Sequence, residues 1–525
     1  MDARLRRARP EGGGPEEGGP DTARLLAGVT EIERATEGDF RVDLERIRFS
    51  PYFSRLAAVT QVITPGVLGS FVNNRLTHTV KVTSVARAVA SRIRAGAHAG
   101  LADELGGCDP VVVQAAASAH DLGHPPFGHL GELALDRLAR SRFGLTDGFE
   151  GNAQSFRILT ALDVHGPGHG LNLTAAVRAA VLKYPWARFG HPDPHPSRNR
   201  LGPKGSGPGP DGSGSVKYSA YVLDVPEMVE VLTAYPQIAP LRQTVECSVM
   251  DVADDIAYSL HDLDDFHRAG VLQHAAIAAE FRTWRRDRET LAGRGLDQLQ
   301  ARERAPGYRL ELLRRRLADK DAWVFDDEVF ATAVGRIAGD LVDGLLAVPF
   351  DGSMDAERAV EAFTGSWIAH LQDSVALERD PHPRSAHVRL DRQAWHEVSV
   401  LKFVHQRFVL DRPDLAGFQR GQAQTIARLV AGYDSWLADP IDGRRVPRRL
   451  IDLVELATAG YRAIARTDRR LLASPTGEIT DSADDLARLG RGRGIVDFIA
   501  SLTDAEAVRA DATLGGSSGD VAGPL

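Results

Sequence analysis

A short segment from His120 to His129 carries an adjacent His-Asp pair and two further histidines, His124 and His129. A neutral imidazole beside a carboxylate can bind one divalent metal ion together with it, and such mixed nitrogen and oxygen ligands suit Mg²⁺, Mn²⁺, Fe or Zn²⁺. Another histidine, His78, lies upstream, and acidic residues lie downstream around Asp254. A lone His-Asp dipeptide is usually structural, but this density of titratable side chains beside glycine and proline indicates a metal site.

The downstream acidic residues lie in a segment with helical periodicity. Asp254, Tyr258 and Asp262 are spaced at i, i+4 and i+8, so they share one face of a helix. Asp255 points about a quarter-turn away from that face. Paired acids on a helix more often form a solvated face, but Tyr258 lies between apolar neighbours, which favours a pocket. We therefore expect His78, His120, Asp121 and one carboxylate of this helix to meet around a metal ion that can activate water against a phosphoryl group.

The composition excludes several other classes of protein. At 525 residues with 43% hydrophobic side chains, the chain should form two or more subdomains with buried cores. The formal net charge of −8 gives no global basic field for nucleic acid, although a local phosphate pocket remains compatible with it. The two cysteines, Cys108 and Cys247, form no disulfide framework and suit a reducing compartment. We find no signal peptide and no apolar run long enough to cross a bilayer, so we expect a cytoplasmic protein with no membrane partner.

Helical periodicity dominates the rest of the chain. His78, Val82, Val85 and Val89 recur on one face, and the small apolar run at 111–119 leads directly into the His-Asp pair. Strand-like alternation is scarce, so the predicted fold is all-α.

The low-complexity segments suggest how the chain is divided. We expect a disordered tail at 1–25, a catalytic core at 30–275, a helical C-terminal subdomain at 276–510 and a second disordered tail at 511–525. Within the core, the motifs occupy about 75–265. A Gly/Pro-rich stretch at 190–215 is expected to be a flexible surface loop, and a second helix-breaking linker is expected around 380–384.

Several ordered blocks resemble one known family, the deoxyguanosinetriphosphate triphosphohydrolases of the HD superfamily. The most specific are AHDLGHPPFGH at 119–129, FEGNAQ at 149–154, LKYPW at 182–186 and ADDIAYS at 253–259. Further matching blocks lie at 46–50, 53–56, 60–62, 74–82 and 170–174. The resemblance covers roughly residues 40–270, and it implies an all-α HD core followed by further helices.

The resemblance implies a metal-dependent hydrolase that cleaves deoxynucleoside triphosphates at the α-phosphorus and releases a deoxynucleoside and inorganic triphosphate. It implies one divalent metal ion per site, with Mg²⁺ or Mn²⁺ favoured and Fe, Ni or Zn as alternatives. The family's metal ligands match His78, His120, Asp121 and Asp254. We choose Asp254 over Asp255 because Asp254 is in helical register with Tyr258 and Asp262.

The same resemblance assigns the catalytic groups. His129 and Glu132 match a catalytic pair near the scissile phosphate, and His124 matches a histidine that contacts phosphate. His129 could give a proton to the leaving oxygen or take one from water, with Glu132 orienting its ring; the sequence leaves the direction open. A glutamate in the first turn of a helix is also a common stabilising feature, which is the alternative for Glu132.

Five further residues are expected to bind the substrate. Arg75 and Lys183 are candidates for offsetting the negative charge of the phosphates, although such side chains near helix ends are usually solvated. Tyr258 and Asp262 match positions that contact the deoxyribose, where Tyr258 would exclude a 2′-hydroxyl and Asp262 would bind the 3′-hydroxyl. Gln61 belongs to a matching block and is expected to contact the sugar or base. The alternative for Tyr258 and Gln61 is a structural role, which is more common for a buried tyrosine or a loop glutamine.

Two segments depart from the family pattern. Residues 216–221 resemble the family's Lys-Tyr-Gly-Tyr-Phe stretch only loosely, and the insert before them is unusual, so the preferred base is not predicted. Near the C-terminus, Ala505 and Glu506 stand where the family usually has Arg-Tyr. Relatives often form homo-oligomers such as hexamers and use a nucleotide or single-stranded DNA as effector, so we expect a homo-oligomer and treat such an effector as an open partner.

Two other functions compete with this interpretation. Another HD-superfamily nucleotide phosphohydrolase or phosphodiesterase would share the metal ligands, but we would not expect it to share the blocks at 149–154 and 182–186. A non-catalytic nucleotide-sensing or nucleic-acid-binding assembly protein would be expected to have lost metal ligands, and none is missing here. The products formed from a deoxynucleoside triphosphate distinguish the three.

Overall fold

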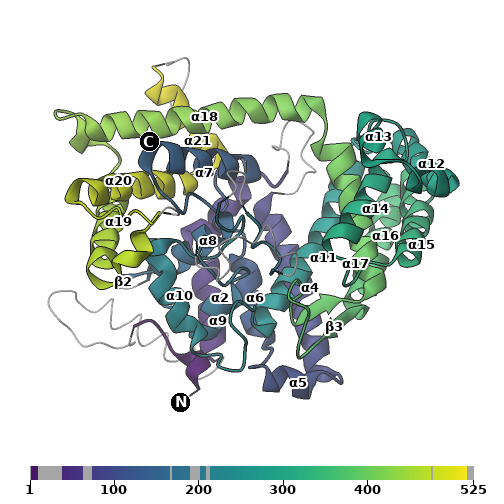
Figure 1. Ribbon diagram of the computed structural model, residues 1–525, viewed down its shortest axis with the longest axis horizontal. Helices are drawn as coiled ribbons and strands as arrows, with labels where there is room; N and C mark the ends of the chain where they lie inside the picture. Colours follow the sequence, from purple (N-terminus) through teal and green to yellow (C-terminus); the bar gives the residue numbers. More distant parts are fainter. Residues whose placement is uncertain are drawn as a thin grey trace.

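The computed structural model describes residues 2–9, 38–62, 74–165, 168–189, 202–208, 213–474 and 477–516. The fold is all-α, as the sequence predicted (Figure 1). Within these ranges the strands form two short antiparallel pairs, β1 (Val164–His165) with β2 (Gly168–His169) and β3 (Val375–Leu377) with β4 (Val388–Leu390). None of the described helices is both long enough and apolar enough to cross a membrane.

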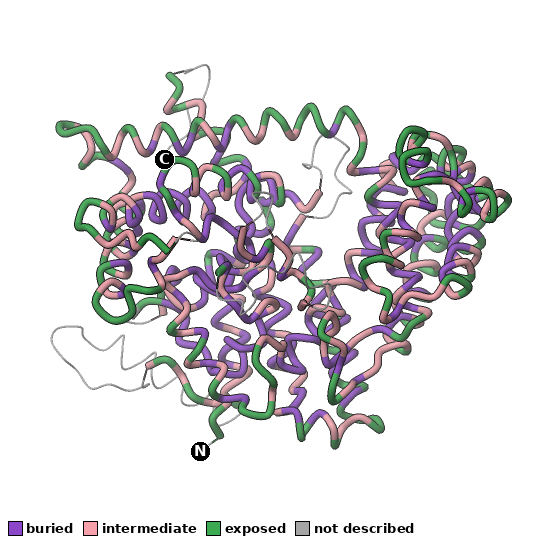
Figure 2. The backbone as a smooth tube through the Cα atoms, in the orientation of Figure 1, coloured by how far each residue is buried: buried purple, intermediate pink, exposed green. Residues whose placement is uncertain are grey.

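The N-terminal half folds around three helices that cross near the centre of the molecule. α4 packs against both α6 and α11, and α2 and α9 pack against α6 (Figure 1). The helices of this half are α2 (Asp39–Arg48), α3 (Pro51–Arg55), α4 (Arg75–Ala95), α5 (Ala99–Glu104), α6 (Pro110–Ala119), α7 (His129–Phe143), α8 (Gly151–Arg157), α9 (Ala175–Ala180), α10 (Val225–Leu232) and α11 (Val245–Arg268). The backbone where the central helices cross is buried (Figure 2).

Local sequence explains where these central helices begin. Asn74 caps α4 by accepting a hydrogen bond from the Thr77 amide, and Thr244 caps α11 in the same way through Cys247. Asp109 caps α6, and Pro110 occupies the first helical position, where its missing N–H costs nothing. Most of α6 consists of small apolar residues that are buried nearly all round, as expected for a helix at the centre of a core.

The turn after α6 positions the His-Asp segment. A side chain at Gly123 would place its Cβ 2.1 Å from the Gly151 carbonyl oxygen, so only glycine allows this close approach to α8. Phe127 and Gly128 both have left-handed backbone angles, with φ of 66° and 61°, just before α7 begins. Asp504 holds this turn by accepting a hydrogen bond from the Phe127 amide at 2.8 Å. The chain therefore reverses direction and returns His129 toward the end of α6.

The second half of the chain is also helical. Its helices are α12 (His274–Ala292), α13 (Leu296–Ala301), α14 (Tyr308–Lys320), α15 (Asp327–Ile337), α16 (Met354–Asp373), α17 (Arg392–His405), α18 (Pro413–Ala438), α19 (Arg448–Thr467), α20 (Ala483–Ala500) and α21 (Asp504–Leu514). α12 to α17 gather on one side of the molecule, and the long helix α18 crosses from them along its edge (Figures 1 and 2).

The end of the chain returns to the N-terminal half. α20 packs against α7, and a buried ion pair joins Arg157 of α8 to Asp497 of α20 at 2.9 Å. A second buried pair joins Asp147 to Arg493. The expected division into a core at 30–275 and a subdomain at 276–510 stays a prediction. In the structure, however, α20 of the second segment packs against helices of the first.

Both expected tails contain ordered residues, which corrects their boundaries. Residues 2–9 include a short 3₁₀ helix (Ala3–Leu5), and Arg7 pairs with the buried Asp43 at 2.5 Å. At the other end, α21 continues to Leu514, so the tail expected at 511–525 does not begin at 511. At the N-terminus, composition gave the wrong boundary because arginines next to a Gly/Pro-rich segment pair with buried carboxylates. Residues 10–25 and 517–525 lie outside the described residues.

Two expected loops are more structured than composition suggested. The segment around 380–384 is the connection between β3 and β4, and Arg242 donates hydrogen bonds to the carbonyls of Pro381, His382 and Ser385. It is therefore a held hairpin loop and not a linker between helices. Of the stretch at 190–215, the structure describes residues 202–208 and 213–215. The Ser215 amide donates a hydrogen bond to the Arg188 carbonyl oxygen at 2.7 Å. The remaining residues lie outside the described ranges, and their flexibility stays a prediction.

Candidate active site

The four predicted metal ligands come together from three helices. His78 lies in the first turn of α4, and His120 and Asp121 follow α6 directly; ligand atoms of these three residues lie within 4.8 Å of one another. Asp254 of α11 places Oδ1 3.3 Å from His78 Nε2 and 3.8 Å from His120 Nε2. Asp255 faces away and pairs with Lys402 at 2.6 Å. We call His78, His120, Asp121 and Asp254 the metal cluster.

The chemistry of the metal cluster fits a divalent cation. His120 Nδ1 lies 2.8 Å from the Ala117 carbonyl oxygen, so Nδ1 is the donor and Nε2 keeps its lone pair in the neutral ring. His120 Nε2 is buried, has no hydrogen-bond partner in the described residues, and faces Asp121 Oδ1 at 3.4 Å. A lone pair beside carboxylate oxygens is repulsive unless a cation lies between them. The two imidazoles and two carboxylates therefore suit a metal ion, although this ligand set does not choose its identity.

Two cations hold the outer oxygens of these carboxylates. Arg75 Nη1 donates to Asp121 Oδ2 at 2.8 Å, and Lys183 Nζ lies 3.1 Å from Asp254 Oδ2. Burial by itself would raise the pKa of Asp121, but His120 and Arg75 hold it well below its usual range. Burial would also raise the pKa of Asp254, but Lys183 and the two cluster histidines hold this pKa well below its usual range. Both carboxylates are therefore ionised, with Oδ1 left to face the histidines.

Arg75 also has unused hydrogen-bond donors. Its side chain is 2% exposed, and Nε and Nη2 have no partner among the described residues. Gly128 lies so close that a Cβ there would be 2.8 Å from Arg75 Nη2. Buried guanidinium donors next to a metal cluster are suited to an anion such as phosphate.

A second group of side chains lies beside the metal cluster. His124 Nδ1 is 3.1 Å from Asp121 Oδ1, and the His124 and His129 rings meet edge to face with centroids 5.0 Å apart. His129 Nδ1 lies 3.0 Å from Glu132 Oε2, while the His129 side chain is 68% exposed. Burial and the nearby Arg75 lower the pKa of His124 to about 4, so this imidazole is neutral at neutral pH. The predicted catalytic residues thus form a continuous path from the cluster to the surface.

Sequence reasoning missed the cation that holds Glu132. Lys217 Nζ lies 2.9 Å from Glu132 Oε1 and 2.8 Å from Glu150 Oε1. Burial would raise the pKa of Glu132, but Lys217 and His129 hold it well below its usual range. The signal was present in the sequence, because Lys217 lies in the block at 216–221 that resembles the family only loosely.

The residues expected at the sugar lie further along α11. Tyr258 is half-buried, and Asp262 is 2% exposed. His405, at the end of α17, was not expected here; its Nδ1 lies 3.5 Å from Asp262 Oδ2, and its ring meets Tyr258 edge to face at 5.0 Å. No sequence pattern links residue 405 to α11, because the two are joined only by the packing of α17 on α11.

Gln61 lies near Gly128. Its Oε1 is buried without a hydrogen-bond partner in the described residues, and its carbonyl oxygen would lie 3.7 Å from a Cβ at Gly128. The neighbouring Thr60 amide donates to Asp504 at 3.0 Å, which anchors this segment to the start of α21. Gln61 is therefore placed next to the turn that carries His129.

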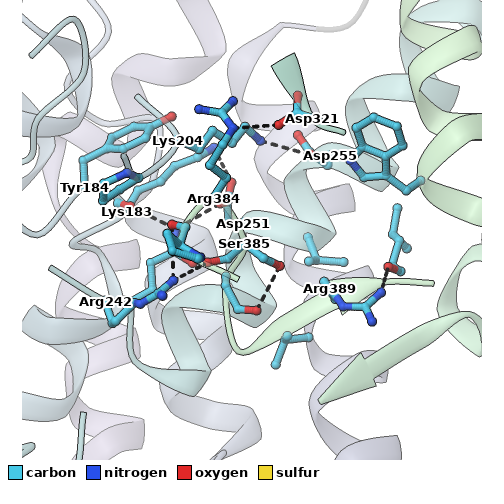
Figure 3. Close-up of a pocket in the computed structure, with 18 of the residues that line it drawn as sticks. Lys183, Tyr184, Lys204, Arg242, Asp251, Asp255, Asp321, Arg384, Ser385 and Arg389 are labelled. Atoms are coloured by element: carbon cyan, nitrogen blue, oxygen red, sulfur yellow. Dashed lines mark hydrogen bonds and ion pairs between the residues drawn. The ribbon is translucent and has the colours of Figure 1, made fainter. Parts of the chain in front are cut away.

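A cavity of about 270 Å³ is lined by Lys183, whose Nζ lies 3.1 Å from Asp254 Oδ2 of the metal cluster; Figure 3 shows the cavity. It lies between α11, the segment that follows α9, the β3–β4 hairpin and α17, and Lys183 lines it. Asp255 lies on its wall, where Lys402 reaches it at 2.6 Å and Lys204 at 3.8 Å. We call this space the basic cavity; sequence reasoning did not predict it.

Comparison with known families finds that the HD domain family matches residues 75–161, a range that contains His78, His120 and Asp121. A deoxyguanosinetriphosphate triphosphohydrolase-like protein of Streptomyces coelicolor is 31% identical over 486 residues, which are 91% of this chain and 92% of that protein. The protein of the same name from Corynebacterium glutamicum is 37% identical over 75% of this chain and 79% of its own length. That from Bifidobacterium longum is 38% identical over 244 residues, or 46% of this chain and 44% of its own length.

Proposed function

Because the chain belongs to the family of deoxyguanosinetriphosphate triphosphohydrolase-like proteins and carries the HD domain of a phosphohydrolase, we propose that it hydrolyses deoxynucleoside triphosphates at the α-phosphorus. Water would form a new bond to the α-phosphorus while the bond from this phosphorus to the 5′ oxygen breaks. The products would be inorganic triphosphate and a deoxynucleoside, whose 5′ oxygen takes up a proton.

The observation that carries this proposal is the metal cluster, in which a buried His120 Nε2, which has no hydrogen-bond partner among the described residues, faces two ionised carboxylates. His78, His120, Asp121 and Asp254 would hold the metal. A divalent cation bound there supplies Lewis acidity toward a phosphoryl oxygen and lowers the pKa of bound water.

Arg75 and Lys183 would offset the charge of the phosphates. Each already contacts one carboxylate of the metal cluster, so each lies next to the place where an α-phosphate would be. Burial would lower the pKa of Lys183, but Asp251 and Asp254 raise it well above its usual value, so the side chain stays cationic. Fixed positive charge in a buried site stabilises the additional charge that develops as water attacks.

His129 would exchange the proton that the reaction requires. Its Nδ1 faces the ionised Glu132 at 3.0 Å, so Nδ1 carries a proton and Nε2 is the atom left for the reacting groups. Glu132 fixes the ring orientation and stabilises the imidazolium, and Lys217 keeps Glu132 ionised. Nε2 would give its proton to the leaving 5′ oxygen or take one from the attacking water.

Tyr258 and Asp262 would hold the deoxyribose. They follow Asp254 by one and two turns of α11, on the same face. The Tyr258 ring would pack under the sugar and leave no space for a 2′-hydroxyl, and Asp262 would accept a hydrogen bond from the 3′-hydroxyl. Gln61, near Gly128, would contact the sugar or base.

The test is product analysis. Purified protein is incubated with each deoxynucleoside triphosphate and Mn²⁺ or Mg²⁺, and the products are separated by ion-exchange chromatography. The expected products are a deoxynucleoside and inorganic triphosphate, and H120A and D121A should lose turnover and metal binding while keeping the helical circular dichroism spectrum. A monophosphate with pyrophosphate, or a diphosphate with phosphate, would assign another phosphohydrolase reaction. No turnover with any metal would overturn the enzymatic proposal.

A further inference from the structure

We propose that Asp504, at the start of α21, is a positioning residue for the reaction, because its carboxylate fixes the turn that carries His124 and His129. This inference rests on the proposed function and extends it to a residue that lies 377 positions after Phe127 in the sequence. Asp504 would act through the backbone of the turn and not on the substrate itself. α21, which lies outside the HD domain, would therefore be needed for catalysis.

The Asp504 carboxylate joins two segments that are distant in sequence. Its Oδ1 accepts a hydrogen bond from the Phe127 amide at 2.8 Å. Its Oδ2 accepts one from the Thr60 amide at 3.0 Å and a second from the Thr60 hydroxyl. Asp504 is 8% exposed, so these hydrogen bonds are largely shielded from water. A carboxylate accepts on both oxygens and forms stronger hydrogen bonds than a neutral acceptor, which suits a link between two backbone amides.

The backbone of the turn requires an external support at Phe127. This residue has a φ of 66°, in the left-handed region that residues other than glycine rarely adopt. Such a conformation persists only where the surrounding structure holds it, and the Phe127 amide is the group that Asp504 holds. The turn also packs tightly on α7, because a Cβ at Gly131 would lie 2.0 Å from the Pro126 carbonyl oxygen. A change at Phe127 is therefore transmitted directly to the start of α7, where His129 lies.

His129 depends on the turn more than on its own packing. Its side chain is 68% exposed, and its ring contacts Glu132 at 3.0 Å and the His124 ring at a centroid distance of 5.0 Å. Since most of the side chain faces solvent, the backbone at 127–129 largely sets where Nε2 lies. Displacing a reacting group by about 1 Å can lower a rate by about 100-fold, so a loosened turn should slow the reaction.

Asp504 also fixes the placement of His129 relative to the metal cluster. Its second partner, Thr60, forms an antiparallel bridge with Asn74, the residue that caps α4. One turn into α4 lies His78 of the metal cluster. One carboxylate therefore ties the turn that carries the proton-exchanging histidine to the helix that carries a metal ligand. α4 itself packs against α6 and α11, so the metal cluster also has supports that do not involve Asp504.

Arg55 connects the same part of the C-terminal half to the other end of the turn. Its Nη1 donates to the Leu502 carbonyl oxygen at 2.8 Å, in the connection between α20 and α21. Its Nη2 donates to the carbonyl oxygens of Leu122 at 2.9 Å and His124 at 2.6 Å. Arg55 is 8% exposed. The connection between α20 and α21 therefore holds the turn at both ends, through a guanidinium at one and a carboxylate at the other.

A capping box holds Asp504 itself in place. Glu506 Oε2 accepts hydrogen bonds from the Thr503 amide at 2.8 Å and the Thr503 hydroxyl at 2.9 Å. In return, Thr503 Oγ1 accepts one from the Glu506 amide at 3.2 Å. This reciprocal pair fixes the first turn of α21, in which Asp504 is the first residue. Glu506 is one of the two residues that depart from the family pattern, so this departure supplies a cap for the helix that carries Asp504.

The first measurement is amide hydrogen exchange, followed by mass spectrometry without substrate. D504N keeps the size of the side chain but turns an NH₂ group toward one of the two amide donors. We expect exchange in a peptide spanning 122–132 to accelerate on the order of tenfold, because a hydrogen bond to a charged group is lost, and exchange in α12 to stay unchanged. E506A removes only an exposed side chain and should produce a smaller acceleration in the same peptide. D511N makes the same substitution on the same helix, where Asp511 pairs with the exposed Arg428; it is the matched control and should leave the turn unchanged.

The second measurement separates kcat from KM. D504N should lower kcat about 10- to 100-fold, because His129 is displaced, and leave KM unchanged, because the substrate-binding residues keep their places. Calorimetry should give the same number of Mn²⁺ ions bound per chain as in the unsubstituted protein. This number counts the folded sites, so it separates a displaced His129 from an unfolded fraction. D511N should match the unsubstituted protein in all three quantities.

Four outcomes would overturn the role of Asp504. They are unchanged exchange at 122–132 in both D504N and E506A, equal acceleration in every peptide, a loosened turn with unchanged kcat, and a loss of Mn²⁺ sites in proportion to the loss of kcat. Exchange and Mn²⁺ binding need no turnover, so the positioning role and the proposed reaction can fail independently. If the unsubstituted protein cleaves no deoxynucleoside triphosphate, accelerated exchange confined to 122–132 would keep Asp504 as the support of the turn and remove only the reaction.

Discussion

Arg75 donates from Nη1 to Asp121 Oδ2 over 2.8 Å, and both side chains are buried. Arg75 begins α4 and His78 follows one turn later, so one helix supplies a cluster imidazole and also orients a cluster carboxylate. Metal sites depend on such outer contacts, because a carboxylate that can rotate is a weaker ligand than one that is fixed.

Replacing Arg75 by lysine keeps the charge but removes the planar guanidinium. We expect R75K to bind Mn²⁺ about 10- to 100-fold more weakly, the usual cost of losing an outer-shell contact, and to have a lower kcat/KM. Calorimetric titration of Mn²⁺ measures the first effect directly. R94K, on the exposed face of the same helix, is the control. Equal Mn²⁺ affinity in R75K and the unsubstituted protein would show that Asp121 needs no support from Arg75.

The adjacent acids on α11 should have separable roles. Asp254 Oδ1 faces His78 and His120, whereas Asp255 faces Lys402 across the basic cavity. D254N should therefore lose Mn²⁺ binding and turnover. D255N should keep Mn²⁺ binding and change mainly KM, because it alters only the charge around the cavity. Mn²⁺ titration of both variants checks this, and a D255N variant without metal binding would reverse the assignment.

The metal cluster could be predicted because its information is local. The spacing of His78 on α4, the His-Asp pair after an apolar helix and the register of Asp254 with Tyr258 each depend on a few neighbouring residues. Helical periodicity fixed the all-α class for the same reason, since it is repeated along most of the chain.

The supporting residues could not be predicted in this way. His405 reaches Asp262, and Lys402 reaches Asp255, only because α17 packs on α11 in the folded chain. Lys217 was within a recognisable block, but its two carboxylate partners, Glu132 and Glu150, come from other segments. Such contacts follow from tertiary packing, for which a single sequence gives no periodic signal.

The beginning of the chain offers a test of the corrected N-terminal boundary. Arg7 is 8% exposed and pairs with the fully buried Asp43, which also accepts hydrogen bonds from Thr174. R7A would remove this cation from a buried carboxylate, and we expect it to lower the free energy of unfolding by about 3 kcal/mol. R6A removes a 42% exposed partner of Glu230 and should cost less than about 1 kcal/mol. Urea unfolding of both variants measures the difference, and equal midpoints would mean that residues 2–9 contribute little to the fold.

Lys217 should control the acid limb of the pH profile through Glu132. Burial alone would raise the pKa of Glu132, but Lys217 and His129 lower it by more. The pKa therefore lies well below its usual range, and the carboxylate is ionised at neutral pH. In K217Q burial is less opposed and this pKa rises, so Glu132 takes up a proton at a higher pH and no longer orients His129. The acid limb of kcat/KM, measured between about pH 5 and pH 8, should therefore move to higher pH, while the value at the alkaline end changes little. K217R should restore the original limb, because it returns the positive charge between Glu132 and Glu150. If K217Q and the unsubstituted protein share one acid limb, Glu132 does not act through its ionised form.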